Sequence, residues 1–357
     1  MFAARLHNST GGIMKVIFST HTPAMLTHGG AQIQLEQTKK ALEKLGVIVE
    51  PLRWWDAEQT GDIFHYLGRV PTYLVQLAHQ QGIRVVMADL LTGPGSRSDG
   101  RLWLEKILRR VFTPMIPGAV KHHFHWDAYR MADACVALTP REAQVMRDSF
   151  RAPRERVHVV PNGVEDEFFQ SEKVPRGPWL ICTATVTERK RVVELAEAAI
   201  LAQTPLWVVG KPYSDSDPYT RRFLQLVAQH PKVLRYEGPV NSRVEIARIY
   251  RQARGFVLLS TKESLSLSAL EAAACECPLL LSDLPWATSY FGNGASYCPI
   301  DSTAKTAAGL KSFYDAAHGL PPPGRPLSWL DVGKQLKAIY ESLLASPLRT
   351  YVSSYGR

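Results

Sequence analysis

The chain has 357 residues and a formal net charge of +9, with 42 lysines and arginines against 33 aspartates and glutamates. That length is too great for one ordinary hydrophobic core and predicts two domains. No run of about 18 apolar residues could span a membrane as a helix, and the first residues lack the apolar core of a signal peptide. The five cysteines are odd in number and lie mostly in apolar runs, which argues against a disulfide framework. We therefore expect a cytoplasmic protein with reduced thiols, in which residues 1–13 are a disordered lead or an over-long start.

The first half of the chain alternates predicted strands with predicted helices. A strand over 15–19 is followed by Gly29 and Gly30, which open an amphipathic helix that ends at Gly46. Two interpretations of this unit stay open: a turn that holds a phosphate, or glycines that only let the chain turn. Further short strands are predicted over 47–52, 62–67, 83–87 and 133–138, and from 157 to the turn at Asn162 and Gly163. Strands that alternate with helices predict a parallel, doubly wound sheet.

A turn-rich loop over 91–100 precedes a basic amphipathic helix. Loops at this end of a sheet tend to touch substrate. The helix over 101–112 carries Lys106, Arg109 and Arg110 beside one apolar face, and that face consists of Leu104, Ile107, Leu108, Val111 and Phe112. Residues 100–156 hold 11 lysines and arginines against 6 acidic residues, a net charge of +5. Two interpretations stay open: the face binds an anionic membrane surface, or it packs on its own core as in an ordinary surface helix.

Three histidines lie close together at His122, His123 and His125. Because no carboxylate or cysteine accompanies them at ligand spacing, we do not expect a metal site there. Downstream, Thr139 and Glu142 have the spacing of a capping box and predict the start of a helix.

The second half repeats the same rhythm after a polar segment over 171–178 that contains prolines and glycine and predicts a linker. Its elements are predicted as strands over 179–184, 206–209 and 233–236 and helices from 191 and over 242–253. A proline-rich break over 321–326 precedes a last helix over 329–344.

Two glutamates flank the start of a helix in the second half. An apolar run over 255–259 predicts a buried parallel strand, and Ala269 to Cys275 favours a helix. Glu263 lies before that helix and Glu271 inside it, at a strand's carboxyl end, where open α/β sheets bind ligands and helix amides favour anions. Either glutamate could instead be an ordinary surface carboxylate. Eight residues of continuous helix would separate them by roughly 12 Å, and the carboxyl groups of hydrolytic pairs lie about 5 to 9.5 Å apart. The spacing therefore argues against a glycosidase.

Four pieces of the sequence together resemble a known family. They are Gly29-Gly30, Val159-Val-Pro-Asn-Gly-Val164, Lys190, and Glu263-x7-Glu271 followed by Ala272 and Cys277-Pro278. In this order they resemble the nucleotide-sugar-dependent retaining glycosyltransferases of family 4, also called glycosyl transferases group 1. The resemblance implies an α/β GT-B fold of two Rossmann-like doubly wound parallel-sheet domains facing a cleft. It implies an acceptor domain over 1–170, a donor domain over 171–330 and a C-terminal helix over 331–357 that crosses back.

The resemblance also implies residue roles. Glu271 would bind the ribose hydroxyls, Glu263 would face the sugar, and Lys190 would neutralise the diphosphate. The remaining contacts would be amides of Leu265, Ser266 and Leu267 to the distal phosphate, Pro239 and Val240 near the base, and Gly29 and Gly30 near the donor or acceptor.

The sequence departs from the family at three places. Ala184-Thr185 stands where relatives have glycine and arginine, so the second phosphate cation is missing or replaced by Thr187, Arg189 or Arg191. Ser264 and Ser266 replace glycines beside Glu263. No histidine follows the fourth strand, which leaves Asp89, His21, His28 and His65 as candidates near the reacting carbon.

We therefore expect a retaining glycosyltransferase that needs no metal or cofactor. It would move a sugar from a nucleotide-diphosphate donor to a glycan, lipid-linked or small-molecule acceptor by a front-side reaction. The expected partners are the nucleotide sugar, the acceptor and an anionic membrane surface at 101–112, but no nucleic acid. Two rival classes remain: a non-catalytic sugar-nucleotide or polysaccharide-binding protein, and a sugar-nucleotide epimerase or phosphorylase on the same fold.

Overall fold

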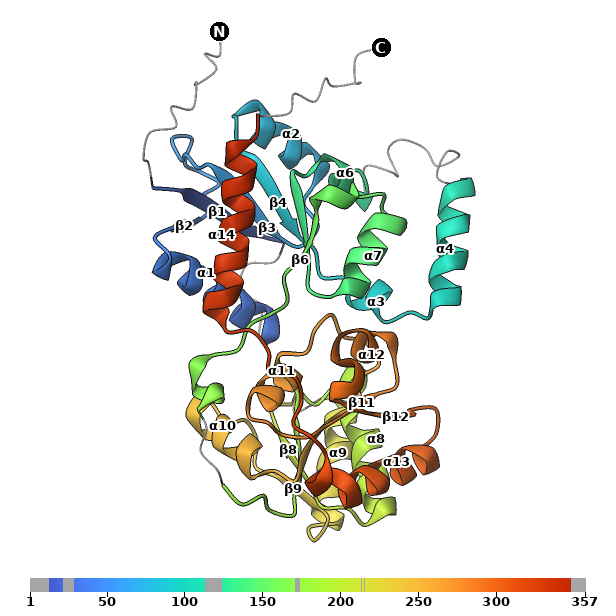
Figure 1. The fold of residues 1–357 in the computed structure, drawn as a ribbon. Coiled ribbons are helices and arrows are strands. Elements are labelled where there is room, and N and C mark those ends of the chain that lie inside the picture. The colour runs from blue at the N-terminus through green and yellow to red at the C-terminus, as the bar shows by residue number, and fades with distance from the viewer. Residues whose placement is uncertain are drawn as a thin grey trace. The chain divides into compact units, whose positions relative to one another are not determined.

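The computed structural model describes residues 13–21, 29–112, 124–170, 174–212, 214 and 216–347 (Figure 1). The chain forms two compact units. The first contains the residues up to Pro94, the segment Asp99–Asn162 and the chain from Trp329 onward. The second contains Gly95–Ser98 and Gly163–Ser328. Two domains of α/β type were predicted from the sequence, and both are present.

The first unit is built on a six-stranded parallel sheet in the order β2-β1-β3-β4-β5-β6. Its strands are β1 (Lys15–Thr20), β2 (Ile48–Pro51), β3 (Ile63–Leu67), β4 (Arg84–Ala88), β5 (Ala134–Ala137) and β6 (Val157–Val159). All five residues of β4 are buried, as expected for a strand covered on both faces. The strand order reverses between β1 and β3, so the topological switch point of this sheet lies between their carboxyl ends.

Helices flank the first sheet. They are α1 (Gly30–Lys44), α2 (Thr72–Gln80), α3 (Thr92–Gly95), α4 (Asp99–Phe112), α6 (Ala128–Met131), α7 (Pro140–Asp148), the 3₁₀ helix Arg154–Arg156 and α14 (Trp329–Ala345). The predicted start of α7 is confirmed, since Thr139 Oγ1 accepts the amide of Glu142. The Glu142 carboxylate departs from a capping box: it accepts the amides of Leu91 and Leu138 instead.

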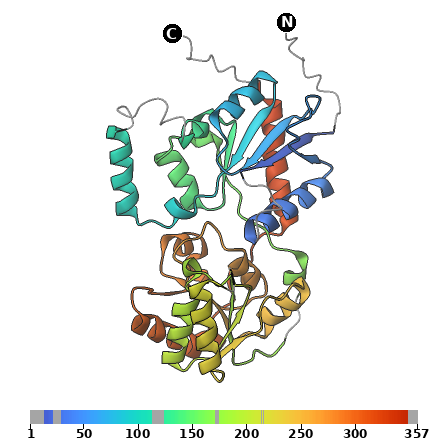
Figure 2. The ribbon, with the colours of Figure 1, turned by 180° about the vertical axis from the view of Figure 1, so that it is seen from behind.

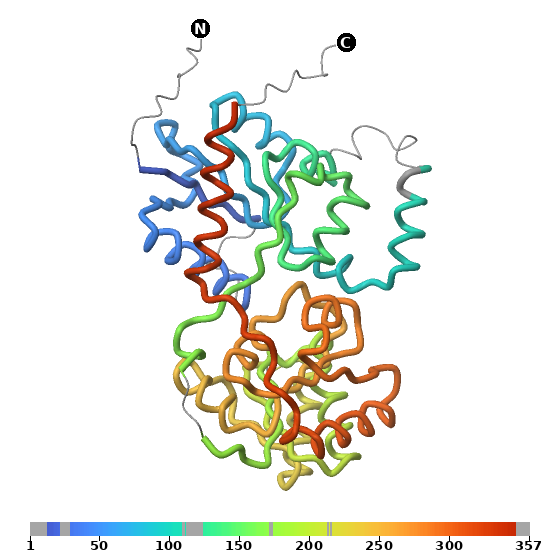
Figure 3. The backbone as a smooth tube through the Cα atoms, in the orientation of Figure 1, coloured from blue at the N-terminus to red at the C-terminus, as the bar shows by residue number. Residues whose placement is uncertain are grey.

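The last helix, α14, packs closely on α1 in the first unit (Figures 1 and 3). A Cβ atom built on Gly333 would lie 3.0 Å from Ala41 Cβ, so glycine at this position permits the close approach of the two helices. The C-terminal helix belongs to the first unit and begins at Trp329, whereas the resemblance implied a helix that crosses back from 331.

The second unit contains another six-stranded parallel sheet, in the order β12-β11-β10-β7-β8-β9. Its strands are β7 (Leu180–Thr183), β8 (Leu206–Val209), β9 (Leu234–Tyr236), β10 (Gly255–Leu258), β11 (Leu279–Ser282) and β12 (Ser296–Cys298). Counted within this unit, the order is 3-2-1-4-5-6, which is the Rossmann arrangement with its switch point between β7 and β10.

Helices also connect the strands of the second unit, and Figure 2 shows them from behind. They are the 3₁₀ helices η4 (Asp166–Phe169), η5 (Glu188–Lys190), η6 (Gly292–Gly294) and η7 (Ala317–Gly319), and the α-helices α8 (Val192–Ala202), α9 (Pro218–Gln229), α10 (Arg243–Gln252), α11 (Leu267–Ala274), α12 (Pro285–Phe291) and α13 (Thr303–Ala316).

The predicted domain boundary at 170 differs from the structure, because residues 163–170 already belong to the second unit. Val164 pairs in parallel with Ser328, and Phe168 is fully buried, with its ring 6.1 Å from that of Tyr250. The segment 174–178, which was predicted to be part of a linker, is attached to the second unit. Arg176 donates to the carbonyls of Tyr250, Arg251 and Ala253, which fastens residues 174–178 to the second unit. Residues 171–173 lie outside the described part of the chain.

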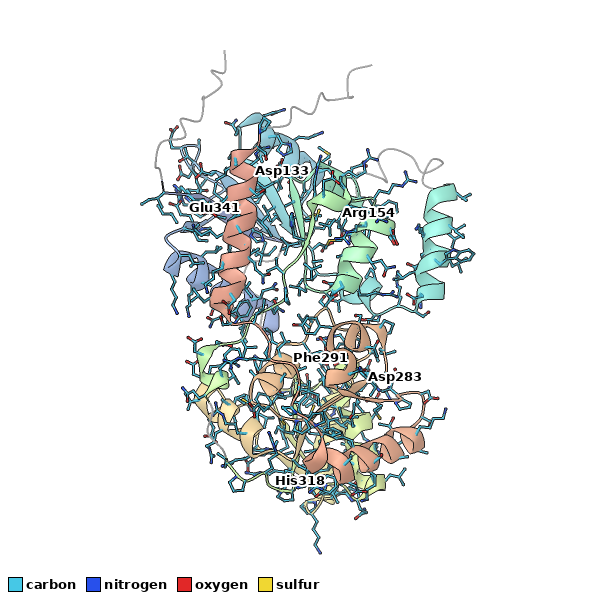
Figure 4. The ribbon with its side chains drawn as sticks, in the orientation of Figure 1. Asp133, Arg154, Asp283, Phe291, His318 and Glu341 are labelled. Atoms are coloured by element: carbon cyan, nitrogen blue, oxygen red, sulfur yellow. The ribbon has the colours of Figure 1, made fainter. Side chains whose placement is uncertain are left out.

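A buried polar network fixes the amino end of the first sheet. Asp133, labelled in Figure 4, precedes β5 and lies 2.8 Å from His79 Nε2 and 3.3 Å from Arg84 Nη1. It also accepts the amide of Val85. Burial alone would raise the pKa of Asp133, but His79, Val85 and Arg84 together hold it below the ordinary value. The polar residues at this end therefore stabilise the fold.

His65 lies buried inside the first sheet, so its candidacy for a contact near the reacting carbon was wrong. It belongs to β3, is buried, and its Nδ1 lies 2.5 Å from the hydroxyl of Tyr340 on α14. The central position of β3 in the sheet explains this burial. Burial lowers the pKa of His65 from 6.5 to about 3, so the imidazole is neutral in the folded protein.

Acid should destabilise the fold through His65. Below the unfolded-state pKa of 6.5 the unfolded chain takes up a proton that the folded imidazole refuses, so stability falls as the pH falls toward about 3. One such group contributes a slope of about 1.4 kcal/mol per pH unit. We expect the double variant His65→Phe/Tyr340→Phe to lose this pH dependence of the free energy of unfolding. Urea unfolding at several pH values between about 6.5 and about 5 measures it. The partly exposed His230→Phe serves as control, and an unchanged slope in the double variant would contradict the assignment.

Candidate functional site

The candidate site begins at the switch point of the second sheet, where the chain leaves β7 and β10 at adjacent carboxyl ends. After β7, the helix η5 ends at Lys190, and after β10 the chain runs into the loop of Glu263. The amide of Thr261 donates to the carbonyl of Arg189 over 2.9 Å, which joins the two segments. Lys190 and Glu263, which are 73 positions apart in the sequence, therefore meet because the strands that precede them are neighbours.

Two cations converge on one carboxylate oxygen of Glu263. Lys190 Nζ lies 2.5 Å and Arg189 Nη1 lies 2.9 Å from Glu263 Oε1. The glutamate is only 8% exposed. Burial would raise the pKa of Glu263, but the charges of Lys190 and Arg189 outweigh it and hold the pKa below its ordinary value. Glu263 is therefore an anion stabilised by two neighbouring cations.

Arg189 occupies the position of a second cation at this site. The sequence left Thr187, Arg189 and Arg191 as substitutes for the family's arginine. Arg189 also donates to the carbonyl of Lys262, whereas Arg191 lies 3.8 Å from Glu194, on the helix α8. Of the three, Arg189 is the one that contacts the loop of Glu263.

The loop predicted over 91–100 contributes a backbone contact to the same site. Ser96, in the segment Gly95–Ser98 of the second unit, accepts the amide of Glu263 over 3.2 Å and donates to its carbonyl over 3.3 Å. One hydroxyl thus satisfies both main-chain groups of Glu263. Sequence reasoning predicted that this loop would lie near substrate but did not single out Ser96.

Glu271 forms a second buried charge cluster on α11. It is 5% exposed, and Arg243 Nη2 lies 2.5 Å from its Oε1, while the Tyr250 hydroxyl donates to its Oε2 over 3.3 Å. Arg243 also pairs with Glu165 over 3.0 Å. Burial raises the pKa of Glu271 above its ordinary value, although Arg243 opposes the shift.

Arg243, Tyr250 and Glu165 were not predicted from the sequence as site residues. Arg243 lies at the start of α10 and Tyr250 near its end, both on the side that packs against α11. Glu165 precedes η4. One feature of the sequence could have indicated Arg243: it lies three residues after Val240, in the segment predicted near the base.

The start of α11 presents main-chain donors. Ser266 is the N-cap and accepts the amide of Ala269 over 3.3 Å, and Leu265 is buried. The amides of Leu267 and Ser268 belong to the first turn, which has no intrahelical acceptors. The residues predicted to offer amides to a phosphate are thus at the start of the helix that carries Glu271.

Other predicted residues lie at the same carboxyl edge. Thr185 is exposed after β7, and Pro239 and Val240 follow β9, with Pro239 exposed and Val240 half-buried. Beside Thr185, a Cβ atom on Gly210 would lie 1.9 Å from the carbonyl oxygen of Ala184. Glycine at 210 therefore permits the close approach that fixes the segment leading to Lys190.

In the first unit, Gly29 is the N-cap of α1 with φ of 102°, and Gly30 is the first residue of that helix. His21 follows β1 and is exposed, while His28 lies outside the described residues. Asp89, which follows β4, pairs with Arg69 over 3.1 Å and accepts the hydroxyl of Tyr129. These residues belong to the unit that does not contain Lys190 and Glu263.

The predicted histidine cluster is only partly described. His125 Nδ1 accepts the amide of Thr72 over 3.4 Å, whereas His122 and His123 lie outside the described residues. Within the described ranges, no group of three histidine, cysteine, aspartate or glutamate side chains is placed to hold a metal ion. None of the helices described is long and apolar enough to cross a membrane. All five cysteines are free and buried, including Cys275 and Cys277.

Two family models match adjoining parts of the chain. The model described as Glycosyl transferases group 1 matches residues 164–315, and the model described as Glycosyltransferase Family 4 matches residues 52–168. Together they match the chain from 52 to 315.

Two curated relatives carry the name D-inositol 3-phosphate glycosyltransferase. The protein from Jonesia denitrificans is 28% identical over 177 residues, covering 42% of this chain and 41% of the relative. That from Nocardiopsis dassonvillei is 28% identical over 188 residues, covering 47% of this chain and 44% of the relative. The match thus spans less than half the length of each relative.

Solved structures share the fold at low identity. A sucrose-phosphate synthase from Thermosynechococcus elongatus has a TM-score of 0.65 and 16% identity, and the match covers 94% of this chain and 100% of that chain. A glycosyltransferase from Rickettsia africae has a TM-score of 0.64 and 13% identity, with coverages of 94% and 99%. Anabaena Alr3699/HepE, solved with UDP and glucose, has a TM-score of 0.60 and 13% identity, with coverages of 92% and 100%. The chain has the two-domain α/β GT-B fold of these solved structures, and because both of its halves match glycosyltransferase family models it is a family-4-like glycosyltransferase.

Proposed function

We propose that the protein transfers a sugar from a nucleoside-diphosphate sugar to a hydroxyl group of an acceptor, with retention of the anomeric configuration. The observation that supports this most directly is the pair of cations, Lys190 and Arg189, beside the start of α11 at the switch point of the second sheet. In this proposal the second unit binds the donor and the first unit binds the acceptor.

The donor diphosphate would bind beside Glu263 at the same two cations. Lys190 and Arg189 carry two positive charges against the one negative charge of Glu263, and the positive charge that is left over favours an anionic ligand such as a diphosphate. The amides of Leu267 and Ser268 add donors on the same side. As the glycosidic bond breaks, the diphosphate gains negative charge, so these groups stabilise the transition state more than the ground state. In this proposal the cations do the work of a metal ion.

Glu271 would accept hydrogen bonds from the ribose hydroxyls. Each carboxylate oxygen can accept more than one donor, and Arg243 and Tyr250 use only part of that capacity. Arg243 also holds the carboxylate in place from α10, so it is a positioning residue. The Anabaena structure solved with UDP and glucose supports a nucleotide sugar as the donor class.

The reaction would form one bond and break one. The acceptor oxygen bonds to the anomeric carbon while the bond from that carbon to the diphosphate oxygen breaks, and the bonding electron pair leaves with the diphosphate. The acceptor proton passes to the departing phosphate oxygen on the same face, which retains the configuration. The two relatives named as D-inositol 3-phosphate glycosyltransferases support a hydroxyl group as the acceptor.

Radiolabelled UDP-, GDP-, ADP- and dTDP-sugars provide the test of activity. Slow release of the free nucleoside diphosphate from one of these donors supports transfer. Binding without release would instead favour a non-catalytic sugar-nucleotide-binding protein, and conversion of the sugar without release would favour an epimerase.

The helix α4 supports an anionic membrane surface as a further partner. Its apolar residues Trp103, Leu104, Ile107, Leu108 and Val111 are between 37% and 64% exposed. Side chains this exposed do not lie in the unit's own core. The side chain of Phe112 is not among those that the structure describes. In Figures 1 and 2, α4 lies on the outer side of the first unit, with α7 between it and the sheet. Lysines and arginines on α4 number four against two acids, so its charge suits anionic headgroups.

Glu271→Ala should weaken binding of the nucleoside diphosphate by roughly tenfold to a hundredfold, because charge-assisted hydrogen bonds to the ribose are lost. Isothermal titration calorimetry with the donor's diphosphate measures the change. Glu245→Ala, which removes an exposed acid on α10 paired with Arg248, is the matched control. Unchanged affinity in Glu271→Ala would contradict the ribose role.

Lys190→Ala should lower kcat by roughly 10² to 10³, as expected for removal of one donor that stabilises developing charge. Initial rates of diphosphate release measure this effect. Lys311→Ala removes a lysine of similar charge from an exposed pair with Asp315 and should leave kcat unchanged. Equal rates in the two variants would count against Lys190 as a phosphate ligand.

Sedimentation with vesicles tests the membrane surface. The protein should bind vesicles that contain phosphatidylglycerol and not those of phosphatidylcholine alone, and added salt should weaken the binding. Leu104→Ser/Leu108→Ser should lose it, whereas Leu201→Ser/Val244→Ser, which alters exposed apolar residues of the second unit, should not. Failure of the unaltered protein to bind would remove this partner.

A further inference from the structure

Two adjacent tryptophans stand exposed in the first unit, and neither the proposed reaction nor the membrane surface uses them. Trp54 is 68% exposed and Trp55 is 83% exposed. A tryptophan ring has a large apolar face that normally gains stability from burial. Two exposed tryptophans at consecutive positions of a turn are therefore a feature that the fold itself does not explain.

The turn that carries the tryptophans is held firmly. Arg53 Nε donates to Asp56 over 2.8 Å and Arg53 Nη1 donates to Glu50 over 2.7 Å, and the amide of Arg53 donates to Gln59 over 2.8 Å. Gln59 also donates to the carbonyl of Pro51 over 2.9 Å. The chain is thus closed on itself between 50 and 59, and the exposed rings sit on an ordered scaffold. A surface that is ordered before binding loses less entropy when a ligand arrives.

The turn lies one strand away from the switch point of the first sheet. It follows β2, so it belongs to the carboxyl edge of the first sheet, and β2 is the outermost strand of that sheet. Leu52 packs against the core and its amide donates to Phe18, which anchors the turn to the neighbouring β1. Open α/β sheets bind their ligands beyond this edge.

The charge of the turn decides between kinds of ligand. The segment 50–59 contains Glu50, Asp56 and Glu58 against Arg53 alone, a net charge of −2. Hydrogen bonds from Lys15, Arg53 and Gln59 lower the pKa of Glu50 to about 2, so this carboxylate keeps its charge at neutral pH. A negative turn repels anionic membranes and nucleic acids, in contrast to the basic helix α4.

We propose that Trp54 and Trp55 form a platform that binds a neutral oligosaccharide, which would be the acceptor if the proposed transfer reaction holds. The C–H groups on one face of a sugar ring carry partial positive charge and pack on the negative face of an indole ring. With two rings exposed at consecutive positions, each can pack on a sugar unit of its own. Arg53, Asp56 and Gln59 are hydrogen-bonded within the turn, so they hold the backbone that carries the two rings in place.

Binding to immobilised neutral oligosaccharides tests the platform directly. The probes are maltoheptaose, cellohexaose, mannopentaose and chitopentaose, with oligogalacturonate as the anionic comparison. The full chain should bind at least one neutral probe better than the anionic one. Trp54→Ala/Trp55→Ala should bind that probe about 10- to 30-fold more weakly, as for loss of central aromatic contacts. Trp54→Phe/Trp55→Phe should keep most of the affinity because it keeps two apolar rings.

Matched controls separate this proposal from its alternatives. Trp103→Ala removes an exposed tryptophan from α4 and should leave oligosaccharide binding unchanged. Trp54→Ala/Trp55→Ala should still release diphosphate from the donor in the absence of acceptor, which keeps failure of the platform distinct from failure of the proposed reaction. The platform is overturned if no neutral probe binds, if the double alanine variant binds as tightly as the unaltered chain, or if that variant instead loses only vesicle binding.

Discussion

The buried carboxylate of Glu263 and its two cations are the interaction on which the candidate site depends. A buried glutamate without a partner would take up a proton or destabilise the loop, since isolated charges are costly to bury. Lys190 and Arg189 remove that cost, and in doing so they hold η5 and the loop after β10 together. The cations are therefore kept at the switch point by the same contact that keeps Glu263 charged. A ligand that competes with Glu263 for them meets side chains that are already in position.

The second cluster differs from the first in its electrostatics. Burial raises the pKa of Glu271 against the opposing charge of Arg243, whereas the charges of Lys190 and Arg189 lower the pKa of Glu263. Arg243 is shared with Glu165, so its charge is divided between two acids. A carboxylate whose charge is less fully compensated keeps more of its acceptor strength for further donors, such as hydroxyl groups. The two glutamates of one sequence motif are thus suited to different parts of a ligand.

The sequence predicted the elements better than the contacts between them. Apolar runs such as 206–209 became β8 with the same bounds, because burial on both faces depends on local composition. The meeting of Lys190 with Glu263 depends on the order of β7 and β10 in the sheet, which no local pattern contains; it was inferred through the resemblance. Arg243 was missed because its role arises from the packing of α10 on α11. Residues 174–178 looked like a linker by composition, and the carbonyl contacts of Arg176 could not be read from it. His65 had the right chemistry for a ligand, but a central strand buries it.

The return of α14 to the first unit has a consequence for how the protein is made. The second unit is nearly continuous in sequence, whereas the first needs residues from both ends of the chain. During synthesis the first six strands emerge early, but α1 lacks the helix that packs on it, and His65 lacks Tyr340, until the final helix leaves the ribosome. The unit that begins first is therefore completed last, and a chain shortened before Trp329 would leave the second unit whole and the first one open along α1.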